Sequence, residues 1–143
     1  MDHEYFDDMV RYTDKMVGRV MAQVAAAGLS EQTYIFFTSD NGSLGNTVSE
    51  IKGRRVRGGK GETTNAGTHV PLVVVGPGMV KGAVSADLVD FSDFLPTLCE
   101  LAGVKPVPVE RFNGQSFLPQ LEGKAGASRE FIYCWYEIPN FMK

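Results

Sequence analysis

The chain has 143 residues, of which 43% are hydrophobic and 22% charged, and its net charge is −3. This composition excludes a disordered, collagen-like or disulfide-framework protein, because apolar side chains suffice for a core and there are two cysteines. The longest apolar run, residues 70–75, is too short to cross a bilayer, and the acidic balance does not indicate nucleic acid or a membrane as a partner.

The first half of the chain predicts one helix and two strands. Apolar side chains recur at helical spacing over residues 4–27, and Gly28 follows as a helix stop. Residues 34–38 are aromatic or β-branched without alternation, which predicts a strand buried on both faces. Residues 43–68 are polar and glycine-rich without periodicity, as in a long functional loop, and residues 70–75 predict a second buried strand.

The second half predicts a shorter helix and further extended segments. Residues 93–102 have a helical apolar face, with Ser92 as the expected N-cap and Gly103 as the stop. A short extended piece is expected at 84–89 and a last strand at 131–136. Cys99 and Cys134 lie within these apolar patterns, so both are expected to be buried small hydrophobes.

This order of elements predicts an α/β fold in which helices flank a mostly parallel sheet, within a single domain over residues 1–143. Ligands of such sheets bind beyond the carboxyl ends of the strands. Asp40 and Asn41 directly follow the first predicted strand. A carboxylate and an amide carbonyl are hard oxygen ligands that suit Ca²⁺ or Mg²⁺. The competing interpretation is a tight turn, which Asn41-Gly42 also favours.

Two further residues are candidates for anion binding. Lys60 stands among glycines that allow a backbone to approach an oxyanion, but the glycine spacing does not match a P-loop. The alternative is a solvated basic loop. His69 precedes the second strand and could donate to an anion or act as an acid, although a lone histidine is more often simply packed.

The order of these motifs resembles the late half of sulfatase catalytic domains, in the alkaline phosphatase superfamily. The resemblance is collinear over nearly the whole chain and rests on residues 12–18 (YTDKMVG), 33–42 (TYIFFTSDNG), 59–61 (GKG), 67–72 (GTHVPL), 89–98 (VDFSDFLPTL) and 113–117 (NGQSF). It implies a partial sulfatase-like α/β domain, the C-terminal portion of the catalytic domain.

The resemblance also implies site roles. In this family the residues matching Asp40 and Asn41 coordinate calcium, and the lysine matching Lys60 contacts the sulfate. Metal and lysine together neutralise a sulfate ester while a formylglycine hydrate attacks sulfur. His69 is carried over as a weaker substrate contact, because many relatives have another residue there.

The nucleophile of the family is absent from these residues. Formylglycine forms within a Cys/Ser-x-Pro-x-Arg motif, and the sequence contains none. Two oxygen ligands also fall short of the six to eight that calcium takes. We therefore expect this polypeptide alone to have no sulfatase turnover and to bind calcium weakly at best. We also expect self-association through an exposed sheet edge.

Other functions remain open at this point. A phosphodiesterase or phosphonate hydrolase of the same superfamily would use more histidine ligands, whereas this chain has two histidines and pairs Asp with Asn. A noncatalytic module could instead hold a polyanion with its basic loop. The substrate could be an aryl sulfate, a carbohydrate sulfate or a sulfamate, and the compartment is undetermined, although such enzymes are often exported.

Overall fold

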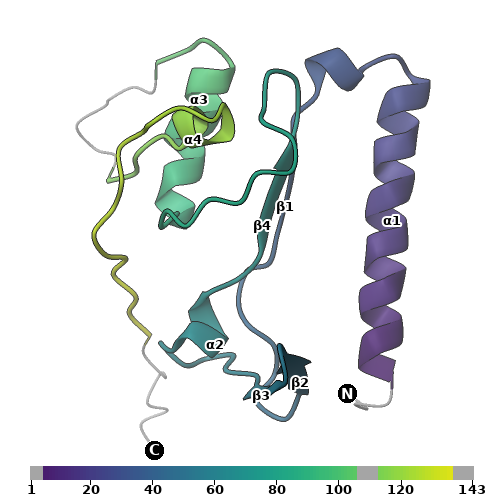
Figure 1. Cartoon of the computed structure of the whole chain (residues 1–143), viewed down its shortest axis with the longest axis vertical. Helices are drawn as coiled ribbons and strands as arrows, with labels where there is room; N and C mark the ends of the chain where they lie inside the picture. The colour runs from purple at the N-terminus through teal and green to yellow at the C-terminus, as the bar shows by residue number, and fades with distance from the viewer. Residues whose placement is uncertain (1–4, 106–112, 137–143) are drawn as a thin grey trace, which may run out of the picture. The chain divides into compact units, whose positions relative to one another are not determined.

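The computed structural model describes residues 5–105 and 113–136, and Figure 1 shows its elements in chain order. These residues form two compact units. The first covers residues up to Pro77 together with the segment from Cys134 onward, and the second covers Gly78–Tyr133. Among the described residues no helix is both long enough and apolar enough to cross a membrane. The prediction of a single domain over residues 1–143 stays a prediction.

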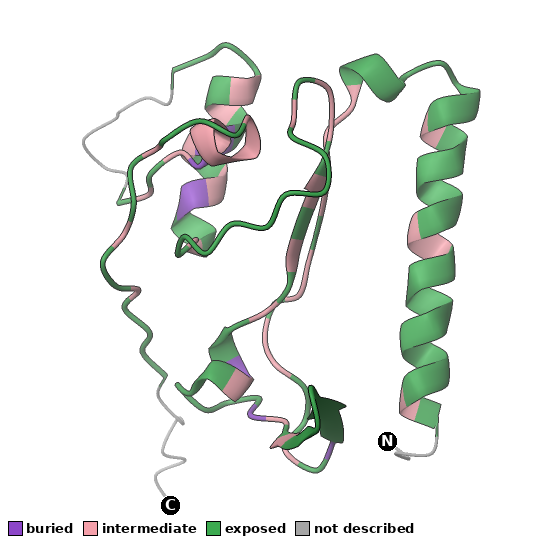
Figure 2. Ribbon diagram, in the orientation of Figure 1, coloured by how far each residue is buried: buried purple, intermediate pink, exposed green. Residues whose placement is uncertain are grey.

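The long helix at the start of the first unit confirms the helical periodicity. Helix α1 spans Phe6–Ala26, within the predicted range 4–27, whose first residue lies outside the described residues. Gly28 follows with a φ of 70°, the left-handed conformation that ends a helix. Asp7 and Asp8 lie in the first turn, where the positive end of the helix dipole favours them. No described residue of α1 is buried (Figure 2).

Strands β1 (Ile35–Thr38) and β4 (Leu72–Val75) form a two-stranded antiparallel sheet, with Thr38 opposite Leu72. The prediction of a mostly parallel sheet is therefore wrong for the strands described. A parallel pair needs a crossover that carries the chain back to the starting edge. Here the connection contains a hairpin and the four-residue helix α2 (Asn65–Thr68), so the chain re-enters the sheet at the edge where β1 ends.

The β1–β4 pair is also more exposed than its apolar sequence predicts. Phe37 is 36% exposed and Val73 is 56% exposed, and neither strand contains a buried residue (Figure 2). Among the described residues these two strands pair only with each other, in a two-stranded sheet. Self-association through an exposed sheet edge stays a prediction.

A β-hairpin occupies the region that the sequence predicted to be an irregular loop. Strand β2 (Val48–Ile51) pairs antiparallel with β3 (Arg54–Arg57). Lys52 and Gly53 form the two-residue turn with φ values of 50° and 75°, the double positive φ of a type I′ turn. Polar and charged side chains dominate both strands, which hid the extended structure from a search for apolar alternation.

The second unit is built around a short helix and the segment that packs on it. The 3₁₀ turn η3 (Phe91–Asp93) leads into α3 (Phe94–Leu101), and α4 (Leu118–Leu121) contacts α3. The predicted helix at 93–102 is confirmed, but Ser92 is not its cap. Asp90 accepts from the Ser92 amide and forms a capping box with Asp93. The ring of Phe117, 5% exposed, meets Phe94 edge-on at 5.7 Å.

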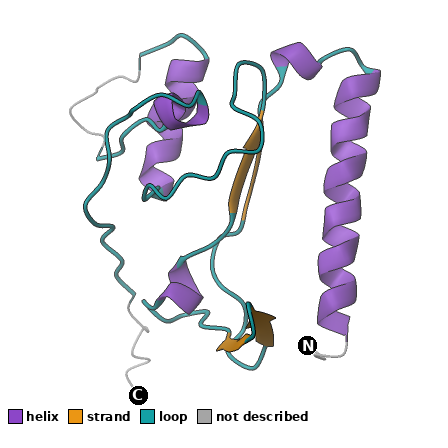
Figure 3. Cartoon of the chain, viewed as in Figure 1, coloured by secondary structure: helices purple, strands orange, loops and turns teal. Residues whose placement is uncertain are grey.

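Two other predicted extended segments are not strands. Residues 84–89 and 131–136 have no strand partner among the described residues and run as loop (Figure 3). Val84 is 96% exposed and Trp135 is 69% exposed. The apolar composition of these two segments was therefore not sufficient to predict strands. Cys134 is exposed and Cys99 is intermediate, so neither is buried and the prediction that both are buried small hydrophobes is wrong.

Candidate functional site

Three loop segments of the first unit meet through backbone hydrogen bonds next to the end of β1. The Gly42 amide donates to the Gly67 carbonyl over 2.8 Å, and the Lys60 amide donates to the Ser43 carbonyl over 2.9 Å. We call residues 42–43, 58–60 and 66–67 the glycine junction. The first segment directly follows Asn41 and the second contains Lys60. The third ends two positions before His69.

Glycine is required in the junction because there is no room for a side chain. A Cβ at Gly42 would overlap the carbonyl oxygen of Ala66, and one at Gly67 would overlap carbonyl oxygens of Glu62 and Gly59. At Gly59 it would lie 2.9 Å from the Cβ of Ala66, closer than real Cβ atoms approach. These glycines therefore serve close backbone packing, which fixes the loop after β1 against the loop that carries Lys60.

The candidate ligands lie at one edge of the β1–β4 sheet. Since Thr38 pairs with Leu72, Asp40 and Asn41 leave β1 at the edge where His69 leads into β4. Asp40, Lys60 and His69 are exposed, and Asn41 is half-buried. The Ser39 hydroxyl donates to the Asn41 carbonyl over 2.9 Å, which tightens the turn at the strand end. The antiparallel β1–β4 pair and the hydrogen bonds of the junction thus bring the backbone of the four candidate residues into one region.

The donor chemistry fits part of a calcium shell. Asp40 supplies carboxylate oxygen and Asn41 an amide carbonyl, both hard ligands, at a strand end that the junction holds in place. No group of three or more His, Cys, Asp or Glu side chains gathers as a metal site in the described part of the chain. The remaining ligands of any calcium ion would therefore come from elsewhere. The convergence of Asp40, Asn41 and the Lys60 amine on one ligand stays a prediction.

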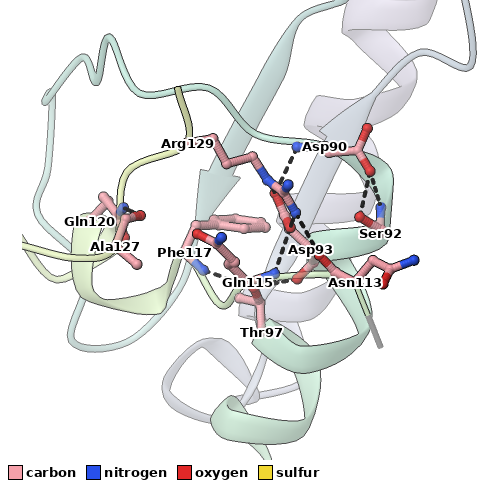
Figure 4. A network of polar contacts seen from close by, with 10 residues as sticks. All are labelled: Asp90, Ser92, Asp93, Thr97, Asn113, Gln115, Phe117, Gln120, Ala127 and Arg129. Atoms are coloured by element: carbon pink, nitrogen blue, oxygen red, sulfur yellow. Dashed lines mark hydrogen bonds and ion pairs between the residues drawn. The ribbon is translucent and has the colours of Figure 1, made fainter. Parts of the chain in front are cut away.

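The second unit contains a polar cluster that the sequence did not single out (Figure 4). The carboxylate of Asp93, 2% exposed, accepts two hydrogen bonds from the Arg129 guanidinium, from Nε at 3.0 Å and from Nη2. It also accepts from the amides of Asp90 at 2.8 Å and Gln115 at 2.7 Å. The spacing of Asp90 and Asp93 could have indicated the capping box, but no local signal pointed to Arg129, 36 residues away.

These contacts set the ionisation of the pair. Burial acts to raise the pKa of Asp93, but the hydrogen bonds from Arg129 and from the two amides outweigh it, so this pKa lies below its ordinary value. The hydrogen bond to Asp93 raises the pKa of Arg129. A carboxylate so fully satisfied has no free lone pair for catalysis. The cluster therefore connects η3, the loop at Gln115 and the segment at Arg129.

A hydroxyl extends the cluster into the core of the second unit. Thr97, fully buried, donates through Oγ1 to the Asp93 carbonyl over 2.6 Å. The same oxygen accepts from the Phe117 amide over 3.1 Å. It thus links α3 to the segment that carries Phe117, and the cluster has a structural role.

Sequence comparison decides the family. A sequence model of the family described as Sulfatase matches residues 2–104, well over half of the chain. The chain belongs to the sulfatase family. It is 32% identical to human arylsulfatase A over 141 residues, which cover 96% of this chain and 27% of that protein. It is 35% identical to mouse steryl-sulfatase, covering 92% of this chain and 23% of that protein.

A third relative is a sulfatase with a different name. The sulfatase chain is 33% identical to rat N-acetylgalactosamine-6-sulfatase over 121 residues, which cover 81% of this chain and 23% of that protein. The chain spans about a quarter of the length of the curated relatives that it matches. The recognition made from the motifs is confirmed, and the family is one of sulfuric ester hydrolases.

Proposed function

We propose that these residues supply the calcium-binding and sulfate-binding part of a sulfatase active site, whose formylglycine nucleophile lies outside the 143 residues. The observation that carries this proposal is the glycine junction. Its hydrogen bonds, at 2.8 and 2.9 Å, attach the loop of Asp40 and Asn41 to both the Lys60 loop and the turn before His69. Substrate and activity are proposed for the protein that contains this segment, since the match covers about a quarter of its relatives.

The chemistry assigned to this chain is charge neutralisation at the sulfate. Asp40 and Asn41 would hold Ca²⁺, which when bound polarises a sulfate oxygen. Lys60 would place an ammonium beside the same group and stabilise the charge that develops as the ester bond breaks. His69, at the same edge of the sheet, would donate a hydrogen bond to the substrate. Sulfate-ester hydrolysis is favoured over phosphoryl transfer, because the chain pairs Asp with Asn and contains two histidines.

The proposal can be tested on the chain itself by nuclear magnetic resonance. Calcium chloride and then sodium sulfate are titrated into ¹⁵N-labelled protein, and the backbone amides are followed. We expect calcium to shift the amides of residues 40–42, and sulfate to shift that of Lys60 only when calcium is present. Weak binding in the millimolar range is sufficient, because the calcium shell is incomplete.

Matched variants make the result specific. Lys60→Ala should abolish the sulfate response but keep the calcium response, and Asp40→Ala should abolish both. Lys15→Ala, which removes an exposed lysine from α1, serves as the control and should behave as the wild type. Sulfate-induced shifts that persist in Lys60→Ala, or that occur equally without calcium, would refute a common site for calcium and sulfate.

A further inference from the structure

The β2–β3 hairpin is a strongly basic element within an acidic protein. Between Val48 and Arg57 the sequence contains four basic residues and one acidic residue, Glu50, for a net charge of +3, whereas the whole chain carries −3. Every hairpin residue in the two strands is exposed except Val56, which is intermediate. The four basic residues are Lys52, Arg54, Arg55 and Arg57.

Most of this positive charge is uncompensated within the described part of the chain. Arg57 donates through Nε to the Gly45 carbonyl over 2.6 Å and lies 3.8 Å from Glu62. Lys52, Arg54 and Arg55 show no ion pair among the described residues, although Glu50 is the cross-strand partner of Arg55. Like charges held on one short hairpin repel one another, and an anionic ligand would relieve that repulsion.

The hairpin is attached to the proposed sulfate site. The Gly58 amide donates to the Thr47 carbonyl over 2.8 Å and closes the base of the hairpin. Thr47 is 7% exposed, and its amide donates to the Leu44 carbonyl over 2.8 Å. Two residues beyond Gly58, the Lys60 amide is bonded to Ser43. The hairpin and Lys60 therefore share one backbone framework.

The strand geometry spaces the cations regularly. Arg55 and Arg57 are two residues apart in β3, so they share one face of the hairpin about 7 Å apart along the strand. Arg54 lies on the opposite face, and the type I′ turn presents Lys52 at the tip. Positive charge is thus distributed over both faces of the hairpin, from Lys52 at its tip toward the segment of Lys60.

We propose that this hairpin is an accessory subsite that binds additional anionic groups next to the sulfate ester to be cleaved. The substrate class is then an oligosaccharide with several sulfates rather than a monosulfated aryl or steryl ester. This inference rests on the proposed function, because Lys60 must receive one of the sulfates. Residues 48–57 contain no aromatic side chain on which bases could stack, which argues against a single-stranded nucleic acid as the ligand.

Binding of a defined probe tests the subsite. The probe is a fluorescent heparin-derived tetrasaccharide, compared with its desulfated form and with a monosulfated aryl ester. Affinities are measured on the 143-residue chain by anisotropy or by competition. The double variant Arg54→Ala/Arg55→Ala should lower tetrasaccharide affinity about tenfold, the effect of losing two exposed charge contacts. The control variant Lys15→Ala/Arg19→Ala removes equal charge from α1 and should retain wild-type affinity.

The ratio of tetrasaccharide affinity to monosulfate affinity separates the two proposals. Lys60→Ala should weaken both ligands alike, whereas the double hairpin variant should lower the ratio. Equal losses in the hairpin and α1 variants would overturn the subsite and leave the sulfate site intact. A wild-type preference for an oligonucleotide of equal charge, or equal binding of the desulfated sugar, would also overturn it. If Lys60→Ala left both affinities unchanged while the double hairpin variant still lowered the ratio, the proposed function would be refuted instead.

Discussion

Replacing Gly42 with alanine tests whether close backbone packing holds the candidate site together. Gly42 is not among the glycines with positive φ, so the substitution is opposed by lack of space rather than by backbone conformation. The new Cβ would overlap the Ala66 carbonyl oxygen and would lie 2.8 Å from its carbonyl carbon and 3.0 Å from the Gly67 Cα. The loop after β1 must therefore move away from the turn before β4.

The cost follows from the contacts that this movement removes. Overpacking at a tight contact costs about 1–3 kcal/mol, and the lost bond from the Gly42 amide to Gly67 costs about 1 kcal/mol more. We expect Gly42→Ala to lower the free energy of unfolding by about 2–4 kcal/mol. Urea denaturation followed by circular dichroism measures this change.

A second glycine provides the matched control. A Cβ at Gly18, within α1, would meet nothing within 4 Å. Because alanine favours helix more than glycine, Gly18→Ala should raise stability by up to about 1 kcal/mol. The same substitution, glycine to alanine, should thus change the free energy of unfolding in opposite directions at the two positions. Equal or greater stability of Gly42→Ala relative to the wild type would refute the packing argument.

Two further predictions concern the buried ion pair and the activity of the chain. Arg129→Met should lower unfolding free energy by about 3 kcal/mol, because it leaves a buried carboxylate without its cation; urea denaturation of Arg129→Lys should show a smaller loss. Because the pKa of Asp93 is lowered in the folded state, its ionisation stabilises the fold above the unfolded-state pKa of about 3.9, and this stability is lost as pH falls through the folded-state pKa. Asp93→Asn should lack this part of the acid sensitivity. Parallel curves of unfolding free energy against pH for wild type and variant would contradict the assignment. The isolated 143-residue chain should release no sulfate from an aryl sulfate, and a clear burst of product in a chromogenic assay would show that its nucleophile lies within these residues.

Local sequence determined the two longer helices, α1 and α3, and the family of this protein. The spacing of apolar residues is enough to define α1, and Gly28 and Gly103 adopt the positive φ values of helix ends. These features depend on contacts within a few residues, so the sequence alone contains the necessary information. The motif order around Asp40 and Lys60 was likewise sufficient to recognise a sulfatase, which the family match confirms.

Tertiary structure decided the pairing of strands and the environment of each polar group. The direction of β4 relative to β1 depends on how 33 intervening residues fold, which strand composition does not encode. The partner of Asp93 lies 36 residues away, and the contacts that require Gly42 and Gly67 join separate loops. Such contacts form only once distant segments pack, because each depends on the position of a backbone that local propensity does not fix.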